Sequence, residues 1–193
     1  EIERRDRANT AAISMGGTLY TPAVGSTDAL PIAALYWRKE TGHYRSRLIF
    51  SVFYNEWDGA LKGNRGVEYL AHLENYTDPF PQEELIGGRS IKSTSAVWGY
   101  GTGWLGVGYR TPVAPFQSDN DLRVQLFCTL KYLYNSRTGD TGTDVHLPPD
   151  TWENGVRLRI RYDGLRRNLM ELPHEGIAWG GDLEWSRRMR WSD

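Results

Sequence analysis

Hydrophobic and polar residues alternate along several stretches of the chain, and this pattern predicts β-strands. In residues 155–165, Val156, Leu158, Ile160 and Tyr162 occupy every second position, and arginines and an aspartate fill most of the positions between them. Successive side chains of a strand point to opposite faces, so this segment would carry one apolar face and one charged face. A helix would instead spread the arginines around its circumference. We therefore expect an amphipathic strand here.

A second stretch, residues 121–136, repeats the alternation over a greater length. Its apolar row ends in Tyr132 and Tyr134, and its polar row is interrupted by Phe127 and Leu133. Strands of globular proteins usually have about 5–6 residues, whereas a tilted strand that crosses a bilayer needs about 9–11. The length therefore favours a membrane-crossing strand, with the tyrosines at the membrane surface. The lipid-facing residues predicted from the two stretches are Leu122, Val124, Leu126, Val156, Leu158 and Ile160.

Further segments have the composition of strands, so the chain is expected to contain about eight strands in all. These segments are 10–21, 29–39, 44–57, 66–77, 94–110 and 176–191. In 94–110, bulky aromatic residues alternate with Gly99, Gly101 and Gly103, and the pattern leaves open which row faces lipid. Residues 1–8 are charged and unpatterned, and we interpret them as an exposed or periplasmic lead-in to a single domain over 9–193.

The expected connections differ in length. Residues 40–43 are a candidate for a tight hairpin turn, and residues 58–66 for a longer one. Residues 79–93, 112–120 and 138–151 are polar and rich in Pro, Gly and Asp, which is typical of loops. Short turns that alternate with long loops are characteristic of outer-membrane barrels.

Composition supports an all-β fold and excludes some classes of protein. The 8 Trp, 11 Tyr and 21 Gly suit such a fold, and Trp and Tyr favour membrane–water interfaces. Lys and Arg number 23 against 24 Asp and Glu, which argues against a nucleic-acid partner. No apolar run is long enough for a transmembrane helix, but a barrel needs none, because only alternate residues of its strands face lipid. Since the chain begins at Glu1, we expect a processed or trimmed product.

Local motifs of catalysis or metal binding are not found in the sequence. The histidines His43, His72, His146 and His174 are scattered, and Cys128 is the only cysteine, so neither a metal site nor an internal disulfide is expected. No nucleophile elbow, phosphate-binding loop or dinucleotide fingerprint occurs. We therefore predict no cofactor and no catalytic residue. A lipid-modifying barrel enzyme with Ser and His groups at its rim stays open as an alternative.

The arginines of 155–165 and the acidic residues of 176–191 form the strongest candidate cluster. If the two segments form a hairpin, these side chains share a face and can pair. One interpretation is a polar barrel interior cross-linked by salt bridges, and the other is a lumen that selects ions or solutes. The predicted lumen-lining residues are Arg157, Arg159, Arg161, Asp163, Asp182 and Glu184.

Two phrases of the sequence resemble the BamA/TamA-like outer-membrane proteins, also called the bacterial surface antigen family. LYTPAVGSTDALPIAALYW (19–37) resembles the opening strands of that family. RYDGLRRNLMELPHEGIAWGGDLEW (161–185) resembles its phrase in which an Arg/Asp-bearing strand runs through Asn and Pro to a Gly and then enters an aromatic strand. The matching positions are Asp163, Asn168, Pro173 and Gly176.

The resemblance implies an antiparallel transmembrane β-barrel of the bacterial outer membrane, with a role in outer-membrane protein assembly, translocation or pore formation. Two features of the family are missing. Arg65-Gly66-Val67 lacks the aromatic residue of the family's Arg-Gly-aromatic motif, and no terminal strand ends in Phe. The chain would then be the first half of a barrel of about sixteen strands, or an unrelated barrel of about eight.

The expected partners are outer-membrane lipids, other envelope proteins or a second barrel segment. Three alternatives remain from the sequence. They are a passive porin or structural barrel, a soluble lipocalin-like or β-sandwich binding protein, and the rim-located lipid enzyme mentioned above.

Overall fold

The computed structural model describes residues 8–20, 28–78, 80–113, 120–167 and 173–188. Its ten strands form one antiparallel sheet in the order β1-β2-β3-β4-β5-β7-β8-β9-β10, and β6 pairs with β7 beside this path. A short 3-10 turn, η1 (Asn64–Gly66), precedes β5. The strands are β1 (Ala8–Tyr20), β2 (Asp28–Glu40), β3 (Tyr44–Ser51), β4 (Tyr54–Lys62), β5 (Val67–Thr77), β6 (Gln82–Ile86), β7 (Arg89–Pro112), β8 (Asp121–Arg137), β9 (Thr151–Arg167) and β10 (Pro173–Arg188).

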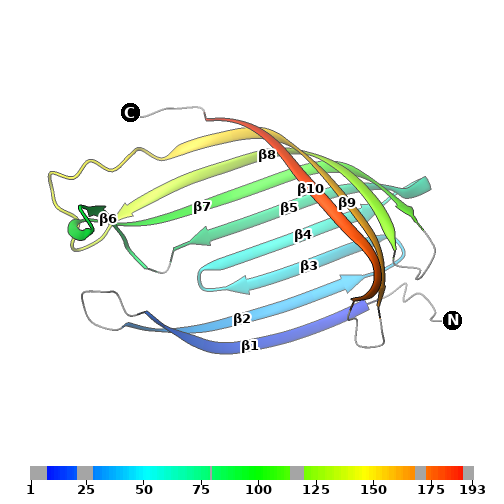
Figure 1. Ribbon diagram of the computed structural model, residues 1–193, viewed down its shortest axis with the longest axis horizontal. Helices are drawn as coiled ribbons and strands as arrows, with labels where there is room; N and C mark the ends of the chain where they lie inside the picture. Colours follow the sequence, from blue (N-terminus) through cyan, green and yellow to red (C-terminus); the bar gives the residue numbers. More distant parts are fainter. Residues whose placement is uncertain (1–7, 21–27, 79, 114–119, 168–172, 189–193) are drawn as a thin grey trace.

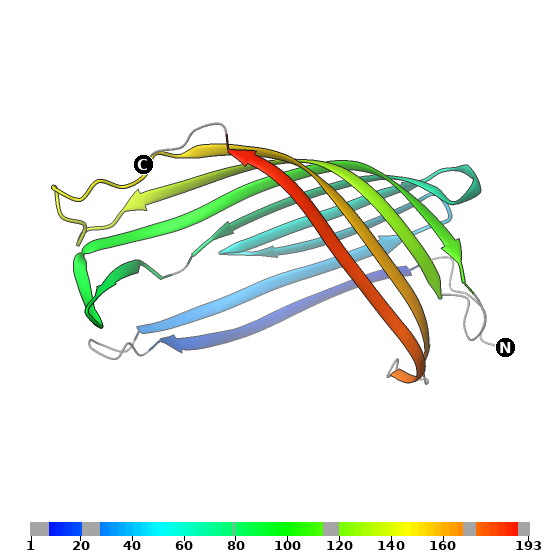
Figure 2. The same cartoon turned by 45° about the horizontal axis from the view of Figure 1, so that its top comes forward.

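The sheet is an up-and-down meander that curls into an open trough (Figures 1 and 2). Each strand pairs with its neighbours in the chain, apart from the short β6 hairpin, and the right-handed twist of the strands accumulates across the sheet. β1 and β10 lie at the two edges, and each pairs on one side only within the described residues. The all-β class and the antiparallel arrangement are confirmed. Closure into a barrel stays a prediction.

The strand register separates the sheet into two chemically different faces. Leu126 pairs with Leu158 on one side and with Val107 on the other, and all three point to the same face. We call this the apolar face. The residues predicted to face lipid all lie on it, since Leu122, Val124 and Leu126 are in register with Tyr162, Ile160 and Leu158, and Cys128 is in register with Val156. In β7, Tyr100 and Trp104 lie on the opposite, polar face, and Gly99, Gly101 and Gly103 lie on the apolar face.

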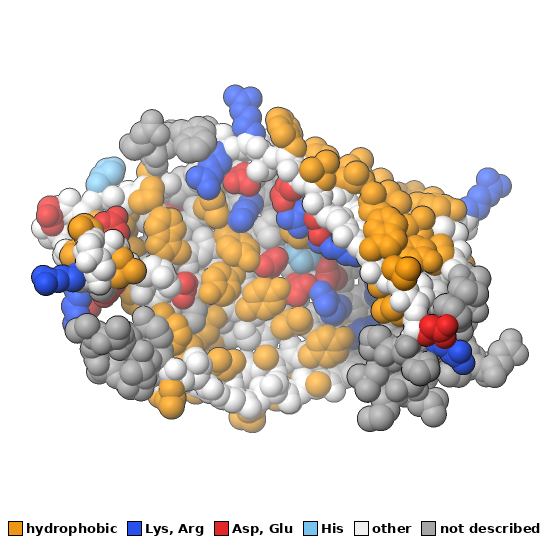
Figure 3. Space-filling model, viewed as in Figure 1, with side chains coloured by type: hydrophobic (Ala, Val, Ile, Leu, Met, Phe, Trp, Pro, Cys, Tyr) orange, Lys and Arg blue, Asp and Glu red, His pale blue; other side chains and the backbone are white. Residues whose placement is uncertain are grey.

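Burial shows which face lies inside the trough. Polar-face side chains such as Glu68, His72 and Gln125 are buried although the described residues form no second layer over the sheet. On the apolar face, by contrast, Leu105 is 71% exposed and Leu183 is 72% exposed. Side chains crowd together on the concave side of a curved sheet and spread apart on the convex side. Figure 3, in the orientation of Figure 1, shows acidic, basic and histidine side chains among hydrophobic ones in the hollow.

The apolar packing on the polar face is small. Ala60, Leu70 and Phe127 are buried together, and Trp104 packs against them. The described part of the chain contains no helix long and apolar enough to cross a membrane.

The structure corrects three expectations about the elements. The predicted strand 44–57 is two strands, because Ser51 Oγ accepts a hydrogen bond from the Tyr54 backbone N–H (3.1 Å) and donates one to the Tyr54 carbonyl (2.8 Å), which closes a turn. Residues 58–62, expected in a turn, complete β4 instead. The predicted loop 79–93 contains the short strand β6. The strand count is therefore ten and not about eight.

The tight turn expected at residues 40–43 is confirmed. Thr41 Oγ1 accepts hydrogen bonds from the backbone N–H groups of His43 (3.2 Å) and Tyr44 (3.1 Å), and the Thr41 N–H donates to the Tyr44 carbonyl (2.8 Å). The predicted long loop after β8 is also confirmed, since residues 138–150 form no strand or helix. The two strongest predicted strands, 121–136 and 155–165, lie within β8 and β9.

Candidate functional site

Ion pairs cross the hairpin of β9 and β10 on the polar face. Arg159 lies opposite Asp182, and Arg157 lies opposite Glu184. Arg159 Nε donates to Asp182 Oδ1 (2.8 Å), Arg161 Nη2 donates to Asp182 Oδ2 (2.6 Å), and Arg157 Nε donates to Glu184 Oε2 (3.0 Å). The prediction that these arginines and acids share a face and pair is confirmed. That this face lines a lumen stays a proposal.

The remaining predicted positions lie near the end of this hairpin. Asp163 is opposite Asp121 in the register, and its carboxylate accepts a hydrogen bond from the Leu165 N–H (3.1 Å). Pro173 begins β10, and Gly176 adopts a positive φ of 105° beside an irregularity in the pairing. Asn168 lies outside the described residues.

A second group of charged residues occupies β3, β4 and β5 on the same face, and the sequence analysis did not identify it. Arg47 Nε donates to Asp58 Oδ2 (2.9 Å), and a terminal nitrogen of Arg47 contacts Glu56. Each ring nitrogen of His72 contacts one carboxylate. Asp58 Oδ1 lies 2.7 Å from Nδ1, and Glu74 Oε2 lies 3.2 Å from Nε2. The group is thus a continuous chain of charge contacts across three strands.

Tyrosine hydroxyls donate to the acids at the outer ends of this chain of contacts. Tyr54 donates to Glu56 Oε2 (2.8 Å), and Tyr100 of β7 donates to Glu74 Oε1 (2.6 Å). No buried side-chain polar atom among the described residues lacks a hydrogen-bond partner. These contacts hold the acids in fixed positions, because hydrogen bonds to charged groups are stronger than those between neutral groups.

Trp104 connects the two charged groups. Its ring stacks on His72 at a centroid distance of 4.1 Å, and the guanidinium carbon of Arg157 lies 4.1 Å from the ring centroid. Phe127 meets the same ring edge-on at 5.9 Å. A charged band therefore runs across the polar face from β3 to β10. It comprises Arg47, Glu56, Asp58, His72, Glu74, Arg157, Arg159, Arg161, Asp182 and Glu184, together with Trp104.

One part of the band has the ligand types of a metal site. One ligand atom each from Glu56, Asp58 and His72 lies within 4.8 Å of the others, and imidazole with carboxylates is a set that divalent transition metals accept. Arg47 already contacts both carboxylates, so a metal ion would have to displace its guanidinium. The arrangement is accounted for by its internal ion pairs.

The apolar face carries aromatic residues towards both ends of the strands. Tyr132 and Trp152 pair near one end with their ring centroids 4.8 Å apart, and Tyr162 and Trp179 stack near the other end at 5.8 Å. The end of the sheet that contains Tyr162 also carries Trp37, Tyr44, Tyr69 and Tyr109. The end that contains Trp152 also carries Tyr134. Aliphatic residues such as Leu105, Leu126 and Leu158 lie between the two aromatic zones.

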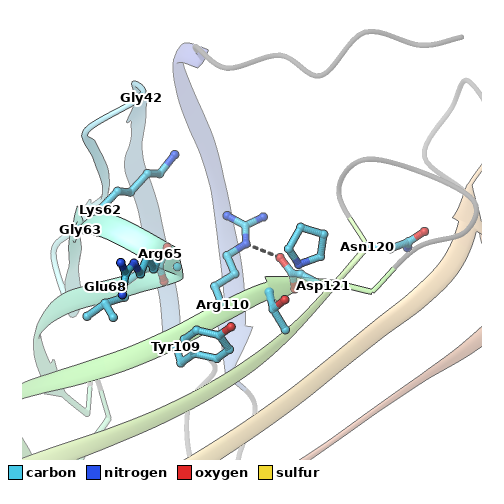
Figure 4. A pocket seen from close by; sticks show the side chains of 13 residues that line it. Gly42, Lys62, Gly63, Arg65, Glu68, Tyr109, Arg110, Asn120 and Asp121 are labelled. Atoms are coloured by element: carbon cyan, nitrogen blue, oxygen red, sulfur yellow. Dashed lines mark hydrogen bonds and ion pairs between the residues drawn. The ribbon is translucent and has the colours of Figure 1, made fainter.

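A pocket of about 480 Å³ opens at the end of the sheet that carries the turns after β2 and β4 (Figure 4). The turn after β2, the turn at η1 and the junction of β7 with β8 surround it. Asn120 and Asp121 are buried there, and Asp121 accepts hydrogen bonds from Arg110 Nε (2.5 Å) and Arg123 Nε (2.8 Å). The charged side chains that line it are Lys62, Arg65, Glu68, Arg110 and Asp121.

In comparisons with known proteins, no protein-family model, no curated protein and no solved structure matches the chain.

Proposed function

We propose that this chain forms the wall of a transmembrane β-barrel of the bacterial outer membrane, with the apolar face against lipid and the charged band lining a water-filled lumen. The observation that carries the proposal is the apolar face itself. It exposes a wide, largely aliphatic zone, interrupted by Trp57 and Trp185, between two aromatic zones, and no residue that the structure describes covers it. Membrane barrels present such a band to lipid between aromatic girdles.

The height of the apolar zone is close to that of the apolar band of outer-membrane barrels. Trp152 and Tyr162 both lie on the apolar face of β9 and are ten positions apart. Ten residues extend for about 33 Å along a strand, and a tilt of about 45° reduces this to about 23 Å across the membrane. The apolar band of outer-membrane barrels is about 25 Å tall.

The distribution of charge supports the same assignment. Outside the β6–β7 hairpin, the described residues that pair on the apolar face carry charge only near strand ends, at Lys39, Arg166, Glu175 and Arg187. Charges in the middle of the strands all lie on the polar face, as in the charged band. A charged side chain is costly against hydrocarbon but is expected inside a barrel.

The narrower role follows from the lumen and from the sequence resemblance. A band of fixed charges can act on ions or solutes that pass along the polar face, which supports a pore. The resemblance of 161–185 to BamA/TamA-like proteins favours a role in assembly or translocation. Conductance across planar bilayers measures the first role, and insertion of a client barrel into vesicles measures the second.

Two matched substitutions test the proposal. Leu105, in the middle of the apolar face, and Leu85, in β6, are exposed to nearly the same extent, at 71% and 72%. In vesicles, Leu105→Arg should lower the free energy of unfolding by about 2–4 kcal/mol, because the guanidinium would enter hydrocarbon. Leu85→Arg should change it by less than about 0.5 kcal/mol. Equal small effects of both substitutions, the result for a water-exposed sheet, would contradict the proposal.

A second measurement uses the wild-type fold. Cys128 is exposed and lies on the apolar face, in register with Leu105 and Val156. A polarity-sensitive dye attached to its thiol should shift its emission to the blue when the protein enters vesicles, and doxyl-labelled lipids should quench it. Emission typical of water in the vesicle-bound protein would contradict the assignment of the apolar face to lipid.

A further inference from the structure

The pocket contains one cationic side chain, Arg65, that no residue described by the structure neutralises, and a second, Arg110, whose ion pair with Asp121 leaves some of its donors free. Arg65 lines the pocket and has no hydrogen bond or ion pair with any residue that the structure describes. Arg110 donates to Asp121 through Nε, and its two terminal nitrogens have no partner within the described ranges. Figure 4 shows the Arg110 guanidinium at the pocket with this bond to Asp121.

The acidic groups in and beside the pocket are already paired. Asp121 forms ion pairs with both Arg110 and Arg123. Glu68 lies 3.8 Å from an arginine nitrogen of β3, and Glu40 forms an ion pair with Lys62 Nζ at 2.9 Å. None of these acidic groups pairs with Arg65, so its positive charge is not balanced by them. Arg65 and Arg110 line the same pocket, and an anion bound there would balance the charge of Arg65.

The backbone holds Arg65 at this place. Arg65 has a φ of 57°, a left-handed conformation that a non-glycine residue adopts at a cost, and Gly66 follows with a φ of 82°. A Cβ at Gly66 would lie 2.3 Å from the carbonyl oxygen of Arg110, so the turn packs directly on the end of β7. The turn therefore places the backbone of Gly66, the residue after Arg65, against that of Arg110.

We propose that this pocket binds a phosphate group. Guanidinium groups are the preferred partners of phosphate, because they offer several N–H donors in a planar fork. The volume of about 480 Å³ exceeds that of a free ion, so an ester with its headgroup fits better than inorganic phosphate. Tyr109 and Val67, which lie on the apolar face, also line the pocket. If the proposed function holds, these residues place the pocket beside the headgroups of the bilayer, and the phosphate belongs to a lipid.

The experiment uses the full chain in a detergent with an uncharged headgroup, titrated in two arms by calorimetry. One arm adds inorganic phosphate, and the other adds a short-chain phosphatidylglycerol. The lipid is expected to bind more tightly than inorganic phosphate. Arg65→Asn removes the charge but keeps a residue that tolerates a positive φ, and should weaken binding about tenfold or more. Arg65→Lys should retain most of the affinity. Arg89→Asn, at the exposed start of β7 at the opposite end of the sheet, should have no effect.

The outcomes separate the sources of phosphate and separate this proposal from the proposed function. Binding of inorganic phosphate alone, lost in Arg65→Asn, would support the phosphate site and reject the lipid source. Absence of binding in both arms, or binding that Arg65→Asn leaves unchanged, would overturn the proposal. The inorganic arm needs no bilayer, so it reports on the pocket even if Leu105→Arg shows that the apolar face does not contact lipid.

Discussion

Trp104 illustrates how single residues organise the polar face. Its indole lies between His72, from a strand on one side of β7, and Arg157, from a strand on the other side. An aromatic face attracts a cation, by about 0.5–2 kcal/mol depending on exposure. Gly106 leaves room for the neighbouring Phe127, since a Cβ there would lie 2.6 Å from the Phe127 ring. One aromatic residue thereby joins charged groups of sequence-distant strands.

Gly66 permits a prediction at the same scale. Gly66→Ala should destabilise the fold by about 2 kcal/mol or more, because alanine at a φ of 82° is strained and its Cβ would meet the Arg110 carbonyl. Gly42→Ala, in the neighbouring turn where no atom lies within 4 Å of the added Cβ, is the matched control. Urea unfolding measures both. Similar stabilities of the two variants would show that the η1 turn does not pack as described.

At the scale of elements, the β9–β10 hairpin relies on paired charges as well as on its backbone ladder. Arg157 and Glu184 have side chains that are 21% and 32% exposed, whereas the Arg166–Glu175 pair at the hairpin end is 57% and 58% exposed. Water screens exposed ion pairs, so their contribution to stability is small. The inner pair should therefore contribute more to stability than the pair at the end.

Double-mutant cycles test this difference. Arg157→Gln with Glu184→Gln should give a coupling energy of about 0.5–1 kcal/mol, and Arg166→Gln with Glu175→Gln should give about zero. The coupling of the inner pair should also persist better in added salt. The same coupling energy in both cycles would mean that water screens the Arg157–Glu184 pair as strongly as the Arg166–Glu175 pair.

The strands with strict alternation could be predicted from the sequence. For strands without strict alternation, the first and last residues could not be predicted. Apolar and polar residues alternate over much of β8 and β9. The placement of their apolar residues on one face of the sheet therefore follows from the pattern alone. The break between β3 and β4 escaped prediction, because apolar residues continue through Val52 and Phe53 and no glycine or proline marks the turn. Gly59, within the segment 58–66 that was expected to form a turn, lies inside β4.

The candidate sites divide in the same way. The arginine row of β9 is visible because three arginines alternate within five positions, and its acidic partners follow on the next strand. Arg47, Asp58 and His72 come from three strands and are separated by up to 25 positions, so only the register brings them together. The phosphate pocket depends on a positive φ at Arg65, which is not encoded in any local motif.

At the scale of the whole molecule, the sheet reverses the usual distribution of residues in a soluble protein. Its buried residues include Glu68, His72, Asp121 and Gln125, and its exposed residues include most of the large aliphatic ones. A soluble sheet buries an apolar face against a second layer. The proposed lipid environment explains the reversal with one cause, because hydrocarbon would cover the convex side and water would fill the concave side.

The separation between Trp152 and Tyr162 has a consequence for where such a wall is stable. An apolar height of about 23 Å is several ångströms less than the hydrocarbon thickness of an average bilayer, which is about 30 Å. A thicker bilayer would have to thin locally around the protein, at a cost that grows with each ångström of mismatch. The protein should therefore partition towards thin membranes, independently of any targeting signal.

Folding into vesicles of graded acyl-chain length measures this preference. The folded fraction, followed by tryptophan fluorescence, should be highest in short-chain lipids and should fall steadily as the chains lengthen. Trp152→Leu removes one anchor and should make the dependence shallower. A folded fraction that is indifferent to acyl length would mean that the aromatic zones do not mark the edges of the bilayer. The expected preference for short chains, in contrast, would make hydrophobic thickness a physical basis by which this chain is sorted between membranes of one cell.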